Sequence, residues 1–318
     1  MRLCCVALNA AIDKTYLVPG FRAGDAYRLE TVVAVAGGKA LNVARTARRL
    51  GVSGVACTGF VAGRSGEWIR GQLAASGIHD DFVEVPGESR EDILIVDPSG
   101  GGETRLLEPG VCVDGAAVEA LIRRVSELAA DSEIVVIAGS LPLGAPAGVY
   151  ARLVREARQA GPRVFLDADG EALRRAAAEG PDLIKVNLEE FGTLSGTAVR
   201  GPEEMLALGR EWRGRSDLVV TLGPQGAVWV GPDAALVAKA PPVAAVMTVG
   251  CGDAFLGGYA AAILGGAGPR EALALGVAAG TANSLSLGPG VVDPEVVERL
   301  RSQVSVSAID GGAGGGHA

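Results

Sequence analysis

A short glycine-rich segment around Asp253 holds the residues best suited to chemistry. Residues 248–253 read T-V-G-C-G-D and lead into an uncharged apolar stretch, which favours a helix that begins at or beside Asp253. Glycines let backbone amides approach a ligand, and a helix start offers unsatisfied N–H groups and the positive end of its dipole. A carboxylate held there is suited to accept a proton from a hydroxyl that attacks a phosphoryl group. The alternative is an ordinary N-cap, because Asp is a favoured capping residue.

Two further segments place polar side chains beside turns in the first part of the chain. Residues 36–45 have two glycines followed by a helical pattern that carries Lys39 and Asn42, but they match neither a Walker A loop nor a dinucleotide fingerprint. Asn9 and Asp13 follow a buried strand, where open α/β sheets bind their ligands. A plain loop-to-helix junction and Asx turns are the alternatives.

Two segments in the second half complete the set of candidates. Asn187 and Glu190 follow a strand and lie one helical turn apart, an arrangement that suits hydrated magnesium or simply a solvent-facing helix start. Residues 221–227 join two strands through a glycine turn, and taken alone they predict a hairpin.

Composition excludes several classes of protein. The chain has only two histidines in 318 residues, too few for a Ser-His-Asp hydrolase or a histidine-rich metal enzyme. A net charge of −8 argues against a nucleic-acid or anionic-membrane binder. Five cysteines without a C-x-x-C pair suit the cytoplasm, and we expect neither a secretory signal nor a membrane span.

Short apolar runs alternate with longer amphipathic ones, which predicts an α/β fold with a mainly parallel sheet. We expect strands at 3–8, 134–138, 164–166, 183–186, 218–222 and 227–230, and helices at 39–50, 65–76, 115–130, 148–160, 202–213 and 254–264. Residues 243–246 also have a β-like pattern. Two β-rich insertions, at about 15–35 and 81–107, predict a small second sheet that acts as a lid. Residues 1–308 are then a single domain, followed by a flexible glycine-rich tail at 309–318.

Taken together and in order, these motifs resemble the ribokinase-like (PfkB) carbohydrate kinases, in particular their phosphosugar branch. Residues 8–15, L-N-A-A-I-D-K-T, are similar to L-N-P-A-I-D-K-T, and residues 37–45, G-G-K-A-L-N-V-A-R, are similar to G-G-K-G-I-N-V-A-R. The later segments E-P-G (108–110), G-S-L-P (139–142), K-V-N (185–187) and T-V-G-C-G-D (248–253) follow the family order, with Val186 replacing proline and Cys251 replacing alanine. The resemblance implies a three-layer α/β/α kinase with a small β-sheet lid.

The resemblance also implies roles for individual residues. Asp253 is the expected catalytic base, and Gly250, Cys251 and Gly252 complete an anion hole. The expected substrate-binding residues are Asp13, Gly37, Gly38, Lys39, Asn42 and Ser140, with Arg28, Arg90 and Arg105 at the substrate phosphate. The expected nucleotide-binding residues are Lys185, Asn187, Glu190, Thr221, Gly223, Gly226 and Asn283, with Asn283 near the adenine and Asn187 and Glu190 holding magnesium through water. A thiol near a helix start has a lowered pKa, so we also expect alkylation of Cys251 to inhibit.

The implied reaction is ATP-dependent phosphorylation of a ketohexose phosphate, namely fructose 1-phosphate, fructose 6-phosphate or tagatose 6-phosphate, to a 1,6-bisphosphate. The implied cofactors are ATP and Mg²⁺, with a monovalent cation as a further implied cofactor. The implied assembly is a homodimer that forms through the lid. One rival is a kinase of a free sugar or a nucleoside, favoured if Arg90 and Arg105 point away from the acceptor pocket. Another is a catalytically silent sugar-phosphate sensor. An oxidoreductase lacks its fingerprint after the first strand.

Overall fold

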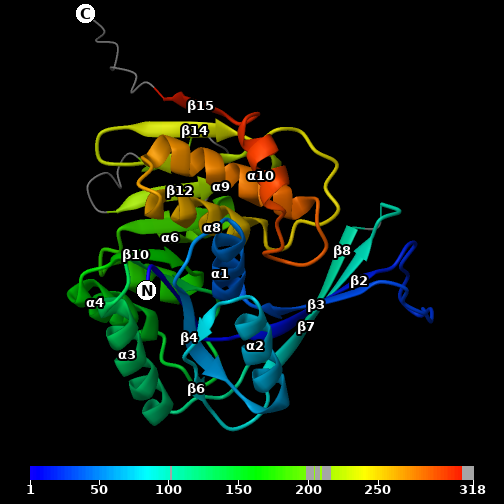
Figure 1. The fold of residues 1–318 in the computed structure, drawn as a ribbon, viewed down its shortest axis with the longest axis horizontal. Helices are drawn as coiled ribbons and strands as arrows, with labels where there is room; N and C mark the ends of the chain where they lie inside the picture. Colours follow the sequence, from blue (N-terminus) through cyan, green and yellow to red (C-terminus); the bar gives the residue numbers. More distant parts are fainter. Residues whose placement is uncertain (101, 198–203, 205–207, 210–215, 310–318) are drawn as a thin grey trace, which may run out of the picture.

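Alternate residues of the central strands face two separate hydrophobic cores. In the computed structural model, which describes residues 1–100, 102–197, 204, 208–209 and 216–309, Leu3 and Cys5 of the first strand pack into one core and Cys4 and Val6 into the other. Because side chains of a strand alternate between the faces of its sheet, continuous aliphatic runs require cover on both faces. Helices provide that cover on each side (Figure 1).

The large sheet is parallel through its centre and antiparallel at one end. Its order is β15-β14-β13-β12-β11-β10-β9-β1-β4-β5, and β6 also pairs with β4. The parallel strands are β1 (Leu3–Ala7), β4 (Val55–Val61), β5 (His79–Asp80), β6 (Val83–Glu84), β9 (Ile134–Ala138), β10 (Arg163–Asp167), β11 (Leu183–Asn187) and β12 (Asp217–Thr221). The antiparallel strands are β13 (Ala227–Val230), β14 (Ala235–Lys239) and β15 (Ser305–Ala308).

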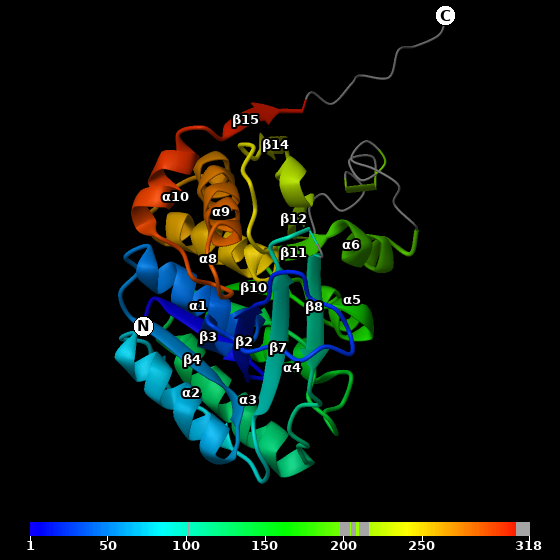
Figure 2. The same ribbon diagram turned by 90° about the vertical axis from the view of Figure 1, so that its right-hand side faces the viewer.

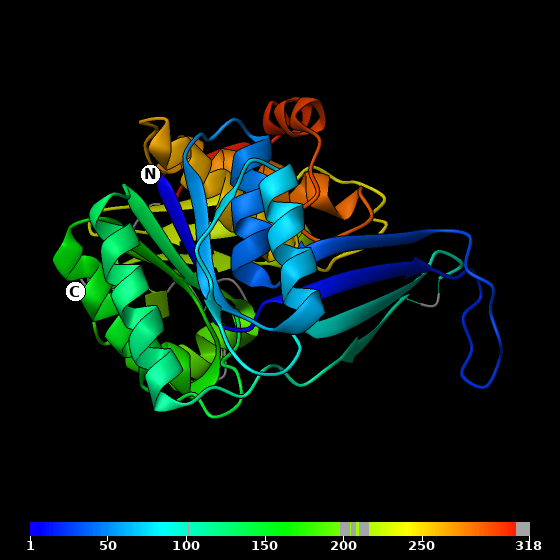
Figure 3. The ribbon, with the colours of Figure 1, turned by 60° about the horizontal axis from the view of Figure 1, so that its bottom comes forward.

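Two groups of helices form the outer layers, so the sheet lies between them (Figure 3). One face carries α1 (Lys39–Arg49), α2 (Gly63–Ala75), α8 (Cys251–Leu264) and α9 (Pro269–Ser284), and α10 (Pro294–Arg301) packs against α9. The other face carries α3 (Gly115–Ala130), α4 (Val149–Ala160), α5 (Gly170–Ala177) and α6 (Leu188–Ser195). The three-layer α/β/α arrangement predicted for the chain is therefore confirmed.

A smaller, four-stranded sheet projects from one side of this body (Figures 1 and 2). Its strands, in spatial order, are β3 (Val32–Gly37), β2 (Ala11–Leu17), β7 (Arg90–Asp97) and β8 (Gly102–Leu107). β2 and β7 are parallel neighbours, so Asp13 lies directly opposite Asp92. The predicted second sheet is present, but residues 82–85 do not belong to it, because β6 pairs with β4 of the large sheet instead.

Other expectations from the sequence need correction. Residues 243–246 form no strand, since they run through a connection between β14 and α8. The sequence patterns also missed β4 and α9, although both are continuous and well buried. The helix predicted at 202–213 and the tail at 309–318 lie almost wholly outside the described residues. The single-domain assignment of residues 1–308 stays a prediction.

None of the described helices is long and apolar enough to span a membrane.

Gly59 allows the central strands β1 and β4 to pair closely. It lies opposite Ala7, its φ is +142°, and a Cβ atom there would lie 1.7 Å from the carbonyl oxygen of Ala7. Gly71 offers a contrast, because it lies exposed on α2 and a Cβ atom would meet nothing within 4 Å. We therefore expect the same substitution to alanine to change the stability of the fold in opposite directions at the two glycines.

We predict that Gly59→Ala destabilises the fold by about 1–3 kcal/mol or more, because the added methyl forces paired backbones apart. Gly71→Ala should be neutral or stabilising by about 0.5–1 kcal/mol, since alanine favours the helix. Thermal unfolding followed by circular dichroism measures both. Equal melting temperatures for Gly59→Ala and the unchanged protein would show that β1 and β4 tolerate the methyl group.

Candidate active site

The carboxyl ends of five neighbouring strands open into one large cavity of about 1180 Å³. Residues at or just after the ends of these strands line it, namely Ala7, Asn9, Ala138, Asp169, Asn187 and Thr221. The smaller sheet forms another wall, and the first turns of α1 and α8 close it on a third side. Open α/β sheets bind their ligands at this edge, so the cavity is the candidate active site.

The first turn of α8 offers unpaired amides to the cavity. The N-cap residue Gly250 has φ +82°, and a Cβ atom on it would lie 2.5 Å from Pro289, so glycine is required there. In the described part of the chain, the amides of Gly252 and Asp253 have no hydrogen-bond acceptor. Free first-turn amides and the helix dipole are the features that suit a helix start to binding an anion.

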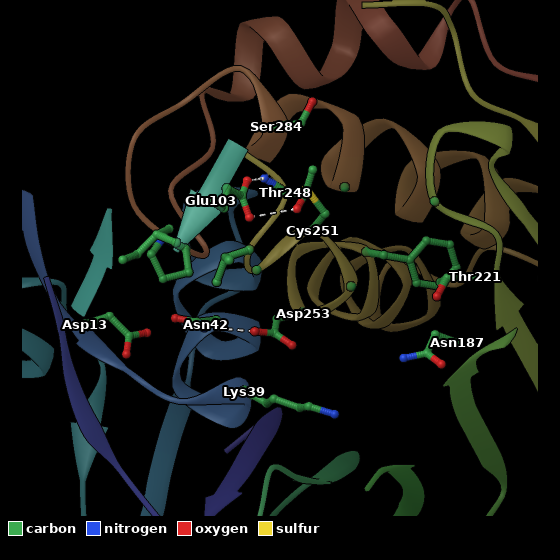
Figure 4. A pocket seen from close by; sticks show the side chains of 18 of the residues that line it. Asp13, Lys39, Asn42, Glu103, Asn187, Thr221, Thr248, Cys251, Asp253 and Ser284 are labelled. Carbon is green, nitrogen blue, oxygen red and sulfur yellow. Dashed lines mark hydrogen bonds between the residues drawn. The ribbon is translucent and has the colours of Figure 1, made fainter. Parts of the chain in front are cut away.

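Asp253 lies at this helix start and is buried. Its Oδ2 atom accepts a hydrogen bond of 2.8 Å from Nδ2 of Asn42, which lies on α1 (Figure 4). Burial and the nearby Asp167 carboxylate raise the pKa of Asp253, while Lys185, Lys39 and the Asn42 amide oppose that rise. The result is a desolvated carboxylate whose proton affinity exceeds that of an ordinary Asp.

Two lysines flank a fully buried carboxylate below this helix start. Nζ of Lys39 lies 2.8 Å from Oδ1 of Asp167, and Nζ of Lys185 lies 2.7 Å from Oδ2. Burial by itself raises the pKa of Asp167, but the two ammonium groups outweigh it and hold the pKa below its usual value. Nζ of Lys39 also lies 3.3 Å from Oε1 of Glu190. Burial by itself lowers the pKa of Lys39, but the neighbouring carboxylates outweigh burial and raise that pKa.

Asp13 and its neighbours form the side of the cavity next to the smaller sheet. The amide of Gly38 donates to Oδ2 of Asp13 over 3.3 Å, and a Cβ atom on Gly37 would lie 2.1 Å from the Asp13 carboxyl. Burial, together with the neighbouring Asp92, raises the pKa of Asp13 to about 6. Gly37 itself is buried behind Asp13, so it makes room for the carboxylate without lining the cavity.

The expected phosphate-binding arginines do not all reach the cavity. Arg90 and Arg105 line it, and Arg90 pairs with Asp92 at 3.1 Å. Arg105 has no hydrogen-bond or ion-pair partner within the described residues. Arg28 lies exposed between β2 and β3 and does not line the cavity. The structure therefore brings two of the three arginines together.

Ser140 and Asn9 line the cavity where β9 and β1 end. Nδ2 of Asn9 donates to Oγ of Ser140 over 3.1 Å, so the two side chains hold each other in place. Oδ1 of Asn9 is buried and has no partner among the described atoms.

The far side of the cavity, beyond Asp253, carries Asn187 and Thr221 (Figure 4). Asn187 and Glu190 form a capping box for α6, in which each side chain accepts from the other's backbone N–H at 2.8 Å. Gly223 and Gly226 line the cavity from the turn between β12 and β13, which is the predicted hairpin. A Cβ atom on Gly226, whose φ is +104°, would lie 2.0 Å from the carbonyl oxygen of Ala238.

The acidic residues here fit a metal held through water rather than directly. In the residues that the structure describes, no cluster of three or more His, Cys, Asp and Glu side chains is arranged to hold an ion. Both carboxylate oxygens of Glu190 are engaged, one by the Asn187 amide and the other by Lys39. Mg²⁺ keeps several waters and binds phosphate oxygens, so it does not need a cage of protein ligands.

Asn283 requires a correction to the sequence-based assignment. It is fully buried and does not line the cavity. Its amide donates to the carbonyl of Val249 at 3.0 Å and accepts from the amide of Gly290 at 2.7 Å. Asn283 therefore braces the loop ahead of α8 and is unavailable to an adenine ring.

The expected reactivity of Cys251 also needs correction. Burial, with the neighbouring Asp253 and Glu103 carboxylates, raises the pKa of the Cys251 thiol to about 11, against a smaller opposing effect of Asn283. The effect of burial on the thiol pKa therefore outweighs the effect of the helix start, and the thiol stays protonated at neutral pH.

Several residues of the site escaped the sequence analysis. Asp167 ends the buried strand β10 and Asp169 follows it, which is the same signal that pointed to Asn9 and Asp13 and could have found them. Glu103 accepts hydrogen bonds from the amide and, over 3.0 Å, the hydroxyl of Thr248, which joins β8 to the loop ahead of α8 (Figure 4). No local pattern signals that contact, because 145 residues separate its partners.

Comparison with known proteins places the chain in a family. Residues 1–295 match the pattern of the pfkB family carbohydrate kinases. A 1-phosphofructokinase of Rhodobacter capsulatus is 34% identical over 312 residues, covering 97% of this chain and 98% of that protein. A 1-phosphofructokinase of Bacillus subtilis (strain 168) is 31% identical over 306 residues, covering 96% and 99%.

A solved structure extends the likeness to the fold. Phosphofructokinase-2 from Escherichia coli, in complex with substrates and products, has a TM-score of 0.89 and 28% identity, covering 95% of this chain and 99% of that one. The same enzyme is also known in complex with potassium and in a tetrameric inhibited form. Because the family pattern spans residues 1–295 and both relatives exceed 30% identity over nearly the whole chain, this protein belongs to the pfkB family of carbohydrate kinases.

Proposed function

We propose that this kinase transfers the γ-phosphoryl group of ATP to a hydroxyl of a ketohexose phosphate, with Asp253 as the general base. The observation that carries the proposal is the position of Asp253. Its carboxylate lies at the anion-binding start of α8, with Asp13 and Asn42 on one side and Asn187 and Thr221 on the other (Figure 4). An acceptor and a donor bound on these two sides meet at Asp253.

In the proposed reaction, Asp253 accepts the proton as the acceptor oxygen bonds to the γ-phosphorus. The bond from that phosphorus to the β–γ bridging oxygen breaks, so the products are a ketohexose 1,6-bisphosphate and ADP. The amides of Gly252 and Asp253 donate to the transferring group, and Gly250 and Cys251 shape the turn that presents them. Lys39 and Lys185 add positive potential beside negative charge that develops on the phosphoryl oxygens.

Polar groups of the smaller sheet and α1 are proposed to orient the acceptor. Asp13, Asn42 and the Gly38 turn suit sugar hydroxyls, and Ser140 adds another polar group. Arg105 is the proposed phosphate receptor, because its guanidinium lines the cavity and has no partner in the described structure. Arg90 supports it from the next strand, although Asp92 neutralises part of its charge.

The opposite side suits the nucleotide. Asn187, Glu190, Thr221, Gly223 and Gly226 line that side of the cavity, as does Lys185 near the phosphoryl site. Magnesium, when bound with ATP, neutralises phosphate charge, and Asn187 and Glu190 would hold it through water. A monovalent cation is a further proposed cofactor, supported by the potassium complex of the Escherichia coli enzyme.

Two further assignments are proposals of the same kind. A homodimer through the smaller sheet is supported by Val32 and Leu106, which are 52% and 54% exposed although they are apolar. Exposed apolar groups on a sheet favour association with another surface. The cytoplasmic location stays a prediction from the cysteine pattern.

We predict that fructose 1-phosphate is the preferred acceptor, as the names of both curated relatives suggest. A coupled assay of ADP release should give the highest kcat/KM for fructose 1-phosphate among fructose 1-phosphate, fructose 6-phosphate, tagatose 6-phosphate, fructose, ribose and adenosine. Greater efficiency with fructose, ribose or adenosine would favour the free-sugar or nucleoside kinase. Absence of turnover on all six would favour a silent sensor.

We predict that Asp253→Asn lowers kcat by roughly 10²- to 10⁴-fold, because the amide cannot accept the proton. Binding of ATP, measured by calorimetry, should persist because the nucleotide side is unchanged. Asp114→Asn is the matched control, since Asp114 caps α3 outside the cavity and Asn also caps helices well. Turnover of Asp253→Asn near that of the control would exclude Asp253 as the base.

We predict that Arg105→Met raises KM for fructose 1-phosphate by roughly 10- to 100-fold, because a charge-assisted hydrogen bond to phosphate is lost. Efficiency with free fructose, where measurable, should stay unchanged, since that acceptor has no phosphate. Arg64→Met, an exposed change on α2 away from the cavity, is the control. An equal loss with both acceptors would contradict phosphate recognition by Arg105.

A further inference from the structure

Arg45 is a buried arginine that connects three parts of the site. It lies on α1, one turn after Asn42, and only 8% of its surface is exposed. Its Nη1 atom donates to Oδ1 of Asn42 at 2.9 Å and to the carbonyl of Pro289 at 2.7 Å. Its Nη2 atom donates to the carbonyl of Ala36, just ahead of the two glycines that precede α1.

The acceptors of Arg45 are all neutral, which is costly for a buried charge. Arg45 forms no ion pair with any residue that the structure describes. Burial lowers its pKa to about 10, and it therefore stays charged at neutral pH, with Asp13 and Asp253 as attracting carboxylates nearby. A buried cation without an ion pair does not stabilise a fold efficiently, so a role in the site explains its presence better.

The chemistry of the two neighbours fixes the orientation of the Asn42 amide. A guanidinium only donates hydrogen bonds, and an ionised carboxylate only accepts them. The Asn42 carbonyl oxygen must therefore face Arg45, and its NH₂ group must face Asp253, which is the observed arrangement. Rotation of the amide by half a turn would lose both hydrogen bonds at once.

We propose that Arg45 is a positioning residue that orients Asn42 and, through it, the Asp253 carboxylate for proton transfer. The inference rests on the proposed function of Asp253 as the base. Arg45 also holds Pro289, whose ring packs against Gly250 at the start of α8. One side chain thus connects Asn42, which donates a hydrogen bond to the proposed base, with Pro289, which supports the anion-binding turn.

The other charged groups facing Asp253 come from different elements. They are Asp167 at the end of β10, Lys185 on β11 and Lys39 at the start of α1. None of them bonds to Arg45. A change at Arg45 that keeps its positive charge therefore leaves their contacts intact and acts on Asp253 through Asn42.

The test is Arg45→Lys, which keeps the charge but cannot hold all three acceptors from one planar group. We expect kcat with fructose 1-phosphate to fall by about tenfold or more, while KM for ATP changes by less than about twofold. The acidic limb of the kcat profile should move to higher pH, because a poorly oriented Asn42 donates less to the ionised carboxylate and the pKa of Asp253 rises further.

Arg49→Lys is the matched control. Arg49 lies one turn further along α1 and donates to the carbonyl of Val292 at 3.2 Å, so it anchors the same connection without touching Asn42. Circular dichroism and ATP binding establish that both variants fold. A kcat of Arg45→Lys equal to that of Arg49→Lys, or an unmoved acidic limb, would overturn the inference.

A double-variant cycle shows whether Arg45 acts through Asn42. If it does, Arg45→Lys should lower kcat far less in an Asn42→Ala background than in the unchanged protein. Equal losses in both backgrounds would overturn the inference. If Asp253→Asn abolishes turnover while Arg45→Lys behaves like its control, only the role of Arg45 fails. If Asp253→Asn keeps turnover, the proposed base and the inference fail together.

Discussion

The paired contacts of Asp167 with Lys39 and Lys185 hold the centre of the site together. A fully buried carboxylate is costly unless opposite charges and hydrogen bonds compensate for its loss of water. Here two ammonium groups at 2.7 and 2.8 Å do so, and they come from β11 and from the start of α1. The end of β10 is thereby tied to elements on both sides of it. The two ammonium groups also lie near Asp253 at the start of α8.

Close backbone approach is the second constraint on this site. Lys185 can lie beneath α8 because Gly252 has no side chain, since a Cβ atom there would lie 2.7 Å from Nζ. Gly250 leaves room for Pro289 in the same way, and Gly37 leaves room for Asp13. These motif glycines thus leave room for charged and rigid groups to pack beside the backbone, in addition to the ligand access proposed for them. That explains part of the high glycine content, 47 of 318 residues.

The smaller sheet adds what the α/β body lacks. Strands β2, β7 and β8 carry Asp13, Arg90 and Arg105 to the cavity, and Glu103 bonds to Thr248 ahead of α8. In the described structure, cavity residues of this sheet and cavity residues of the large sheet lie on opposite sides of Asp253 (Figure 4). The position of Asp253, the proposed base, between them follows from the two sheets together.

The sequence by itself determined the alternating strands and helices, the smaller sheet and most motif residues that line the cavity, because these depend on local periodicity and on turns at strand ends. Only the tertiary structure decided the environments. Burial gives Cys251 a raised pKa and commits Asn283 to backbone partners, whereas Arg28 lies exposed and outside the cavity. Contacts such as Asn42 with Asp253 join residues 211 positions apart. Desolvation and long-range pairing depend on what packs nearby in space, which no local pattern encodes.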